Sequence, residues 1–285
     1  MSQRKAAINR VIGKPRLTMQ TRTDTFSCEA EVNQSTALPP ENRAVNVPAY
    51  LKDVYGWAYL NPRGMAIFDR PWMVSAILFG NYRRLQRVFL DELEPGLKVL
   101  QAACVYGHFS RNLASFLGPH GRLDVIDVAE IQVVNCKRKL KPFPYARAFV
   151  ADAASPPAAT YDAISSFFLL HEMPDDYKRA VVNALLSSVR PGGKVVFVDY
   201  HKPHSANPLK GLMSLVFDAL EPYAKSLWRN EIAAFANTPE RFEWHRQTYF
   251  GGLYQKVVAR CRDHQSDSHR ESSRRQFLDL GQAYR

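Results

Sequence analysis

Strand-like and helix-like segments alternate along residues 97–200, and this alternation restricts the possible folds more than any other feature. Short apolar runs at 121–127, 146–152 and 194–200 each adjoin a segment with helical spacing of apolar residues, such as 129–140. Because the connections are short, the strands are expected to form a parallel sheet with helices on both faces. The sequence therefore predicts an α/β fold with a doubly wound, mostly parallel sheet.

The two ends of the chain differ from this central region. The first 46 residues and those after residue 261 contain few bulky apolar side chains, and residues 1–23 contain Lys and Arg but no acid. Such segments cannot bury enough apolar surface to form a core. We expect disordered tails at 1–46 and 262–285 around a folded domain at 47–261. The basic N-terminus is also compatible with a mitochondrial transit peptide.

Helical segments are expected on both sides of the alternating region. Apolar spacing predicts helices within residues 50–94, which end at Pro95-Gly96. Residues 203–245 interrupt the alternation, and a long apolar helix at 209–228 makes this insertion a candidate lid over the substrate. The same helix could provide an apolar path for a lipid tail, or it could simply be buried on both sides.

Charge and composition limit the partners. The formal net charge is +11, which favours nucleic acid, anionic lipid or acidic ligands. Because nucleic-acid-binding motifs are missing from the sequence, we expect an anionic membrane surface and no nucleic acid. No apolar run reaches the ~18 residues needed to cross a bilayer, and the four scattered cysteines indicate a reducing compartment. The oligomeric state is left open.

The ends of the first three predicted strands carry residues suited to a nucleoside ligand. The segment VLQAACVYGHFS (99–110) reads as a strand, a loop and the start of a helix. Asp127 ends the second strand about 20 residues later, where an acid can bind ribose hydroxyls. Asp152 ends the third strand, where it could meet an adenine edge. Their neighbours Val128 and Ala153 complete this predicted nucleoside site.

The fourth and fifth strands end in groups suited to proton transfer. His171 follows the fourth strand, while Tyr200 and His201 end the fifth, and we predict these three as catalytic residues. His201 and His204, together with Asp199, have a spacing that could hold Mn²⁺, although such a set also arises by chance. His171 could also lack a catalytic role, and Glu172 could be a helix N-terminal acid.

Two longer stretches carry a resemblance to a known superfamily. YDAISSFFLLHEMPDD and LLSSVRPGGKVVFVDY resemble the class I S-adenosylmethionine-dependent methyltransferases, which have a Rossmann-like fold, and within them the ubiquinone/menaquinone C-methyltransferases. The resemblance implies S-adenosylmethionine as a cofactor. In that superfamily the loop after the first strand usually reads acid-x-Gly-x-Gly-x-Gly. Here those positions hold Gln101, Ala103, Val105 and Gly107, with Tyr106 beside the last.

These substitutions have physical consequences. Val105 is β-branched, so it disfavours a positive φ and blocks close approach of a ligand to the backbone. Neutral Gln101 removes the usual partner of the cofactor's ammonium group. We expect all five loop residues from Gln101 to Gly107 named above to bind the cofactor in an altered pose.

Three segments together resemble a more particular family, the rhodoquinone biosynthesis proteins of the RquA family. They are the altered loop, ILFGNYRRL (77–85) and ERFEWHRQTYFGGLYQKVV (240–258). The resemblance implies conversion of ubiquinone to rhodoquinone, with S-adenosylmethionine as amino donor and a divalent metal such as manganese. It also implies a cytoplasmic enzyme peripheral to a bacterial inner membrane, or alternatively one of the mitochondrial matrix. Two other readings are an ordinary methyltransferase acting on a quinone or aromatic precursor, and an inactive binding subunit.

Overall fold

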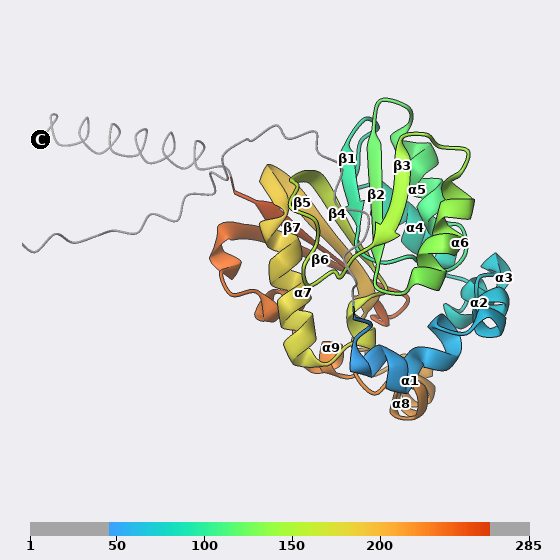
Figure 1. Ribbon diagram of the computed structural model, residues 1–285. Helices are drawn as coiled ribbons and strands as arrows, with labels where there is room; N and C mark the ends of the chain where they lie inside the picture. Colours follow the sequence, from blue (N-terminus) through green and yellow to red (C-terminus); the bar gives the residue numbers. More distant parts are fainter. Residues whose placement is uncertain (1–45, 263–285) are drawn as a thin grey trace, which may run out of the picture. The chain divides into compact units, whose positions relative to one another are not determined.

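The central sheet is built as the sequence predicts. The computed structural model describes residues 46–262, and its sheet has seven strands in the order β3-β2-β1-β4-β5-β7-β6 (Figure 1). Strands β1 to β5 pair in parallel, while β7 runs antiparallel to β5 and β6. The strands are β1 (Lys98–Gln101), β2 (Arg122–Asp127), β3 (Ala146–Val150), β4 (Tyr161–Phe167), β5 (Val189–Tyr200), β6 (Phe242–Tyr249) and β7 (Tyr254–Cys261).

Helices cover both faces of this sheet, which confirms the predicted doubly wound fold. One face packs against α4 (Tyr82–Leu90), α5 (Phe109–Leu117) and α6 (Glu130–Leu140), and the other against α7 (Asp175–Ser187) (Figure 1). Leu113 of α5 and Val181 of α7 are fully buried in the two apolar layers. The strand order reverses between β1 and β4, so the carboxyl ends of these strands form the expected ligand site.

The predicted helical region 50–94 consists of separate helices because proline interrupts it. It contains α1 (Ala49–Tyr59), α2 (Pro62–Phe68) and α3 (Pro71–Ile77) before α4. Pro62 and Pro71 each occupy the first turn of a helix, where a missing backbone N–H costs nothing. The side chain of Asn61 accepts a hydrogen bond from the Arg63 amide at 2.9 Å and caps α2.

The segment after β5 is also divided. The predicted helix 209–228 is broken into α8 (Leu209–Leu220) and α9 (Ser226–Arg229), and the 3₁₀ turns η2 (Ile232–Phe235) and η3 (Pro239–Arg241) follow. The predicted insertion to residue 245 extends too far, because β6 already begins at Phe242. The antiparallel pair β6 and β7 was not predicted as strands. Apart from residues 46 and 262, the predicted tails lie outside the described residues.

Helices α1 and α8 lie side by side at one edge of the molecule (Figure 1). The Tyr55 hydroxyl donates to Oε2 of Glu221 over 2.6 Å, and the ring of Tyr50 packs edge-on against that of Tyr223. The loop between β1 and α5 is in turn fixed by the N-terminal helices. Segments from opposite ends of the described chain therefore meet over the carboxyl ends of the strands.

Gly107 is the one position in the β1–α5 loop that requires glycine. Its φ is 78°, and an added Cβ would lie 2.6 Å from the hydroxyl oxygen of Tyr82. That hydroxyl donates to the Tyr106 carbonyl oxygen at 3.2 Å and accepts from the His108 amide at 2.9 Å. Neither Ala103 nor Val105 has a positive φ, so the backbone strain predicted from a β-branched residue at position 105 is not present.

We predict that Gly107→Ala destabilises the protein more than Gly118→Ala. Both glycines have positive φ, 78° and 70°, but a Cβ at Gly118 would meet no atom within 4 Å. Gly118→Ala should cost about 1–3 kcal/mol of unfolding free energy from the backbone alone, because a φ of 70° with a ψ of −179° is a conformation that almost only glycine adopts. Gly107→Ala should cost about 1–3 kcal/mol more because of the overlap with Tyr82. Urea unfolding followed by circular dichroism measures both; equal losses would contradict the packing argument.

Candidate functional site

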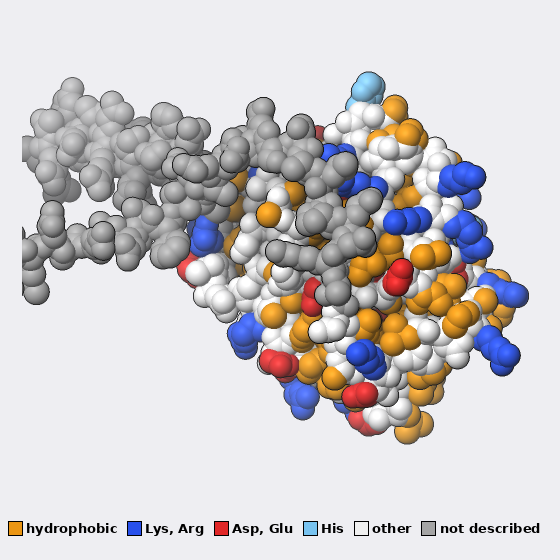
Figure 2. Space-filling view, viewed as in Figure 1, with side chains coloured by type: hydrophobic (Ala, Val, Ile, Leu, Met, Phe, Trp, Pro, Cys, Tyr) orange, Lys and Arg blue, Asp and Glu red, His pale blue; other side chains and the backbone are white. Residues whose placement is uncertain are grey.

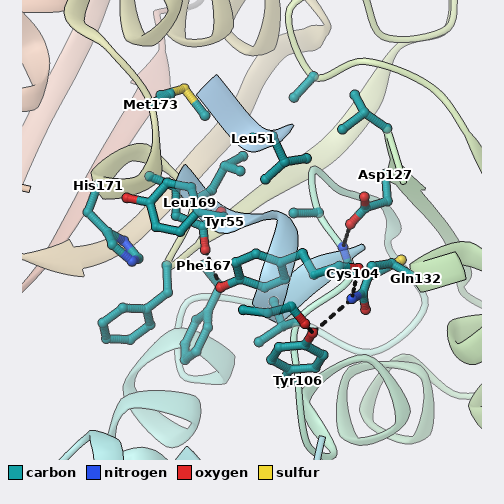
Figure 3. Close-up of a pocket in the computed structure, with 18 of the residues that line it drawn as sticks. Leu51, Tyr55, Cys104, Tyr106, Asp127, Gln132, Phe167, Leu169, His171 and Met173 are labelled. Atoms are coloured by element: carbon teal, nitrogen blue, oxygen red, sulfur yellow. Dashed lines mark hydrogen bonds between the residues drawn. The ribbon is translucent and has the colours of Figure 1, made fainter. Parts of the chain in front are cut away.

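A cavity of about 210 Å³ lies at the carboxyl ends of the central strands, bordered by α1 and by the β1–α5 loop (Figure 3). Its walls are mostly apolar and aromatic, with a few polar side chains among them. This composition is typical of a site for a small organic ligand. Most of the site residues predicted from the sequence line this cavity, namely Ala103, Val105, Tyr106, Asp127, Val128, Asp152, Ala153, His171 and Tyr200.

Asp127 is held at the end of β2 by backbone groups. Its carboxylate oxygens accept hydrogen bonds from the amides of Cys104 and Ala129, both at 2.8 Å. Burial raises the pKa of Asp127 to about 6, although these hydrogen bonds oppose the shift. Figure 3 shows Asp127 beside Cys104 at the cavity wall. The acid therefore faces the space in which a ribose would bind.

Asp152 is oriented by a tyrosine of α7. Its Oδ2 accepts a hydrogen bond from the Tyr177 hydroxyl, and its Oδ1 accepts one from the Ala154 amide at 2.8 Å. Burial and then the contact with Asp152 raise the pKa of Tyr177, so this hydroxyl keeps its proton. Tyr50 packs edge-on against Tyr177 at 5.2 Å between ring centroids. These rings form an aromatic wall where an adenine could stack.

Tyr106 locks the altered loop to the N-terminal helices. Its hydroxyl donates to the Ala58 carbonyl oxygen at 2.6 Å and accepts from Nε2 of Gln132 at 2.9 Å. Its ring stacks on Tyr59 with 5.2 Å between centroids and an interplanar angle of 11°. Figure 3 shows Tyr106 and Gln132 joined in this way below the cavity. The loop is therefore held in one conformation by α1 and α6.

Gln101 does not replace the missing acid as a free ligand group. Its Nε2 donates to the Ala103 carbonyl oxygen at 2.6 Å and to Oγ of Ser110 at 2.9 Å. The side chain is 1% exposed, and its Oε1 has no hydrogen-bond partner. The amide therefore braces the loop, and the acidic partner for an ammonium group has to lie elsewhere.

His171 forms a buried pair with Asp199. Its Nδ1 lies 2.9 Å from Oδ1 of Asp199. The Asp199 carboxylate also accepts hydrogen bonds from the Leu170 and Tyr200 amides. Burial lowers the pKa of His171, but the charge and hydrogen bond of Asp199 outweigh it and raise the pKa to about 9. At neutral pH His171 is therefore a cation that can donate a proton.

The predicted metal site is not formed. Asp199 accepts from His171 and from backbone amides, while His201 turns to the β6–β7 hairpin and donates from Nδ1 to the Gly252 carbonyl oxygen at 2.8 Å. His204 packs against Gly252, whose added Cβ would lie 2.7 Å from its ring. Within residues 46–262, no group of three or more His, Cys, Asp or Glu side chains is placed to hold a metal ion. The donor set therefore does not fit Mn²⁺.

Sequence reasoning missed Tyr55, Tyr59 and Glu221 of the cavity, and it considered Glu172 only as a possible helix N-terminal acid. Tyr59 donates to Oε1 of Glu172, and Tyr55 donates to Oε2 of Glu221. Burial raises the pKa of Glu172 to about 8 and also raises that of Glu221. The spacing of Tyr55 and Tyr59, four residues apart on one helix face, was the available signal. No such signal pointed to Glu221, since it lies at the end of a helix that is far from Tyr55 in the sequence.

The comparisons with known proteins define the class of this domain. Residues 99–193 match the family model described as a methyltransferase domain. A protein from Bordetella parapertussis described as a possible exported protein shares the fold with a TM-score of 0.51 and 19% identity, over 71% of this chain and 73% of that one. An O-methyltransferase candidate from Nostoc punctiforme has a TM-score of 0.50 and 19% identity, over 63% and 56%. The chain carries a class I S-adenosylmethionine-dependent methyltransferase domain.

Two curated relatives are weakly similar over a longer stretch. A demethylmenaquinone methyltransferase from Desulfitobacterium hafniense is 27% identical over 158 residues, which is 53% of this chain and 61% of that protein. The ubiquinone/menaquinone biosynthesis C-methyltransferase UbiE from Ectopseudomonas mendocina is 26% identical over 185 residues, or 61% and 70%. The chain thus spans less than two thirds of the length of the first relative.

The cavity fits the nucleoside part of S-adenosylmethionine. Asp127 borders the cavity with its carboxylate, and the aromatic wall of Tyr50 and Tyr177 lies beside Asp152. Tyr200 also lines the cavity and is 6% exposed, yet its hydroxyl makes no hydrogen bond with the described residues. A hydroxyl that opens into the cavity without a protein partner is available to a ligand. The residues present therefore suit the cofactor that the domain class implies.

We predict that Asp199→Asn lowers the pKa of His171 from about 9 toward its ordinary value of 6.5, because burial is then opposed by the charges of Glu221 and Glu172 alone. The raised pKa also means that protonated His171 contributes stability fully below pH 6.5, and that this contribution is lost as pH rises through about 9. NMR titration of ¹⁵N-labelled histidine, assigned with His171→Gln, measures both states. Asp218→Asn, an exposed acid of α8, is the control. Titration of His171 near 6.5 in the unmodified protein would contradict the pairing.

Proposed function

We propose that this protein converts ubiquinone to rhodoquinone by exchanging a ring methoxy group for an amino group. S-adenosylmethionine would supply the nitrogen: its neutral α-amino group would bond to the ring carbon while the methoxy group leaves with a proton as methanol. The Cα–N bond would then break by elimination, with its electron pair staying on nitrogen and a β-proton lost from the remainder of the cofactor. The observation that carries the proposal is neutral Gln101 where methyltransferases usually hold an acid, in a loop that Gln101 and Tyr106 hold in place although two of its usual glycines are replaced. The apolar and aromatic cavity suits a quinone ring beside a nucleoside.

The residues of the cavity can be given roles in this reaction. Asp127 would hold the ribose and Asp152 the adenine, with Val128 and Ala153 as their apolar neighbours. An α-ammonium group has an ordinary pKa of about 8 and must lose its proton before its nitrogen can attack a quinone carbon. A carboxylate at position 101, where the side chain contacts Ala103 of the cavity wall, would favour the charged form, so neutral Gln101 removes one of the charges that would stabilise it.

His171 and Tyr200 would act on the quinone. Because Nδ1 of His171 is engaged by Asp199, Nε2–H is the group left to donate. A cationic donor beside a quinone oxygen stabilises the negative charge that develops when the ring is attacked. The unpartnered Tyr200 hydroxyl can donate in the same way. His201 lies at the β6–β7 hairpin and has no role in this scheme, and no step is routed through a metal ion.

A second function is favoured by the relatives, which are named as quinone-pathway methyltransferases. In that case the same cavity would place a quinone precursor beside the methyl group of S-adenosylmethionine, and the product would carry an additional methyl group. Gln101 has no explanation in this scheme. Amination therefore accounts for more of the observed residues.

Isotope labelling separates the two functions. We predict that purified protein, given detergent-dispersed ubiquinone and S-adenosylmethionine labelled with ¹⁵N in its α-amino group, forms rhodoquinone that contains the label. Mass spectrometry of the extracted quinones, with and without added Mn²⁺, measures the product. In a parallel reaction with ¹³C-methyl-labelled S-adenosylmethionine and a demethylated quinone precursor, incorporation of the methyl label would establish the methyltransferase. An unlabelled quinone pool in both reactions would exclude both functions.

Gln101→Glu tests the residue that carries the proposal. The substitution should lower the amination rate at neutral pH about tenfold or more, and the rate should recover as pH rises and the amine loses its proton. Gln247→Glu on the exposed face of β6 is the matched control. An unchanged rate and pH profile for Gln101→Glu would exclude the assigned role.

We also propose that the protein binds an anionic membrane surface, where ubiquinone resides. The large hydrophobic side chains exposed on α1–α3, on the turn after α3 and on α8 are Trp57, Ile67, Trp72, Ile77, Phe79, Leu212, Leu215 and Leu220. Trp57 and Ile77 also line the cavity, so the exposed apolar surface is continuous with it. Figure 2 shows hydrophobic side chains over this region with Lys and Arg at its edge. No helix within the described residues is long and apolar enough to cross a bilayer.

We predict flotation with vesicles that contain phosphatidylglycerol and weaker binding to neutral phosphatidylcholine. Trp72→Ser and Leu215→Ser should each reduce the bound fraction, since 60% and 67% of these side chains are exposed for insertion. Val134→Ser, 61% exposed on α6, is the matched control. If Trp72→Ser, Leu215→Ser and Val134→Ser all bind the vesicles as well as the unmodified protein does, this surface is excluded as the membrane-binding surface.

A further inference from the structure

Two glutamates from distant parts of the chain face the same cavity. Glu172 lies in the 3₁₀ turn η1 (Leu170–Glu172) after β4, and Glu221 directly follows α8. Each accepts one hydrogen bond from a tyrosine of α1, Tyr59 and Tyr55 respectively. The second oxygen of each carboxyl group makes no hydrogen bond with the described residues, and both side chains line the cavity. One acceptor of each glutamate is therefore left for a ligand.

Tyr200 provides an independent indication of a ligand at this place. It is 6% exposed, it lines the cavity, and its hydroxyl has no hydrogen-bond partner among the described residues. Burial, and after it the charges of Tyr254 and Glu221, raise the pKa of Tyr200, so its hydroxyl keeps its proton and can donate. An unpartnered hydroxyl beside open carboxylate oxygens is an arrangement that a polar ligand completes.

The glutamates lie next to the altered loop. Tyr59 bonds to Glu172 through its hydroxyl and stacks on Tyr106 of the loop at 5.2 Å. A single aromatic ring therefore links the loop to the carboxyl pair. The acid usually found at the end of β1 is Gln101 here, and its amide nitrogen is engaged by Ala103 and Ser110.

We propose that Glu172 and Glu221 form the binding site for the α-ammonium group of S-adenosylmethionine, in place of the acid that is absent at Gln101. The proposal rests on the proposed function in that it assigns the ligand of the same cavity. It does not require that the nitrogen be transferred. An ammonium group carries three donors, and the open oxygens of the two glutamates supply two acceptors.

The electrostatics of the pair support a cation site. Burial raises the pKa of Glu172 to about 8, with the charge of Glu221 adding to the rise, while His171 opposes it. The pair therefore retains a proton near neutral pH, and binding of a cation should displace it. The other ionisable groups that influence Glu172 or Glu221 come from α1, the β1–α5 loop, β2 and β5, namely Tyr50, Tyr55, Tyr59, Tyr106, Asp127, Asp199 and Tyr200.

The same pair could accept the proton that amination requires. Transfer from an ammonium group of pKa about 8 to an ordinary carboxylate of pKa about 4 is unfavourable by roughly ten-thousand-fold. Transfer to Glu172, with its pKa of about 8, is close to balanced. The N–H bond breaks, the Glu172 O–H bond forms, and the nitrogen keeps its electron pair as a neutral amine.

Calorimetry tests the site without relying on turnover. S-adenosylmethionine is titrated into the full-length protein near neutral pH in two buffers of different ionisation enthalpy, which gives the protons released on binding. We expect release of about one proton per ligand bound. Methylthioadenosine, which lacks the amino acid portion, should bind without this release. Glu172→Gln and Glu221→Gln should each abolish the release and weaken S-adenosylmethionine about tenfold or more.

The controls separate this site from a structural role. Glu130→Gln, an exposed acid of α6, should behave as the unmodified protein, and both cavity variants should still bind methylthioadenosine normally. Equal weakening of both ligands, unchanged proton release in the variants, or no binding of S-adenosylmethionine at all would overturn the proposal. Proton release without nitrogen transfer would support this ammonium site and exclude amination. Labelled rhodoquinone without proton release would support amination and exclude this site.

Discussion

The stack of Tyr59 on Tyr106 connects the two halves of the site. On one side Tyr106 is bound to Ala58 and Gln132, which fixes the loop that follows β1. On the other side Tyr59 is bound to Glu172, which fixes the turn that follows β4. The parallel sheet brings the ends of β1 and β4 together, but it does not close the space above them. Helix α1 closes it, because its aromatic side chains bond to both loops at once.

The sequence predicted what depends on local periodicity and on strand ends. The parallel strands, the covering helices and the positions of Asp127 and Asp152 could all be read from it, since each follows from a short segment. The cavity wall was harder to predict because it depends on contacts between distant segments. Tyr55 and Glu221 are hydrogen-bonded across 166 residues of sequence, and no local pattern indicates that contact.

The predicted metal site shows why spacing alone can mislead. His201, His204 and Asp199 are close in sequence, and strand alternation alone would put Asp199 and His201 on the same face, but β5 ends at Tyr200 and the chain leaves the sheet there. Asp199 consequently meets His171, while His201 bonds to Gly252 of the β6–β7 hairpin, which was itself not predicted. The register of β7 against β5 therefore decides which of these groups reach the cavity.

Burial gives the polar groups of the cavity protonation states that differ from those in water. His171 carries a proton because Asp199 faces it, whereas Glu172 keeps one because desolvation outweighs the nearby positive charge. His171 and Glu172 have similar pKa values, about 9 and about 8. Either group can therefore become the proton donor or the proton acceptor when a charged ligand binds. A methyltransferase needs no proton acceptor for the cofactor's amino group, whereas a reaction at that nitrogen does. As an ammonium site the carboxyl pair would serve either chemistry, whereas its use as a proton acceptor would be particular to a reaction at nitrogen.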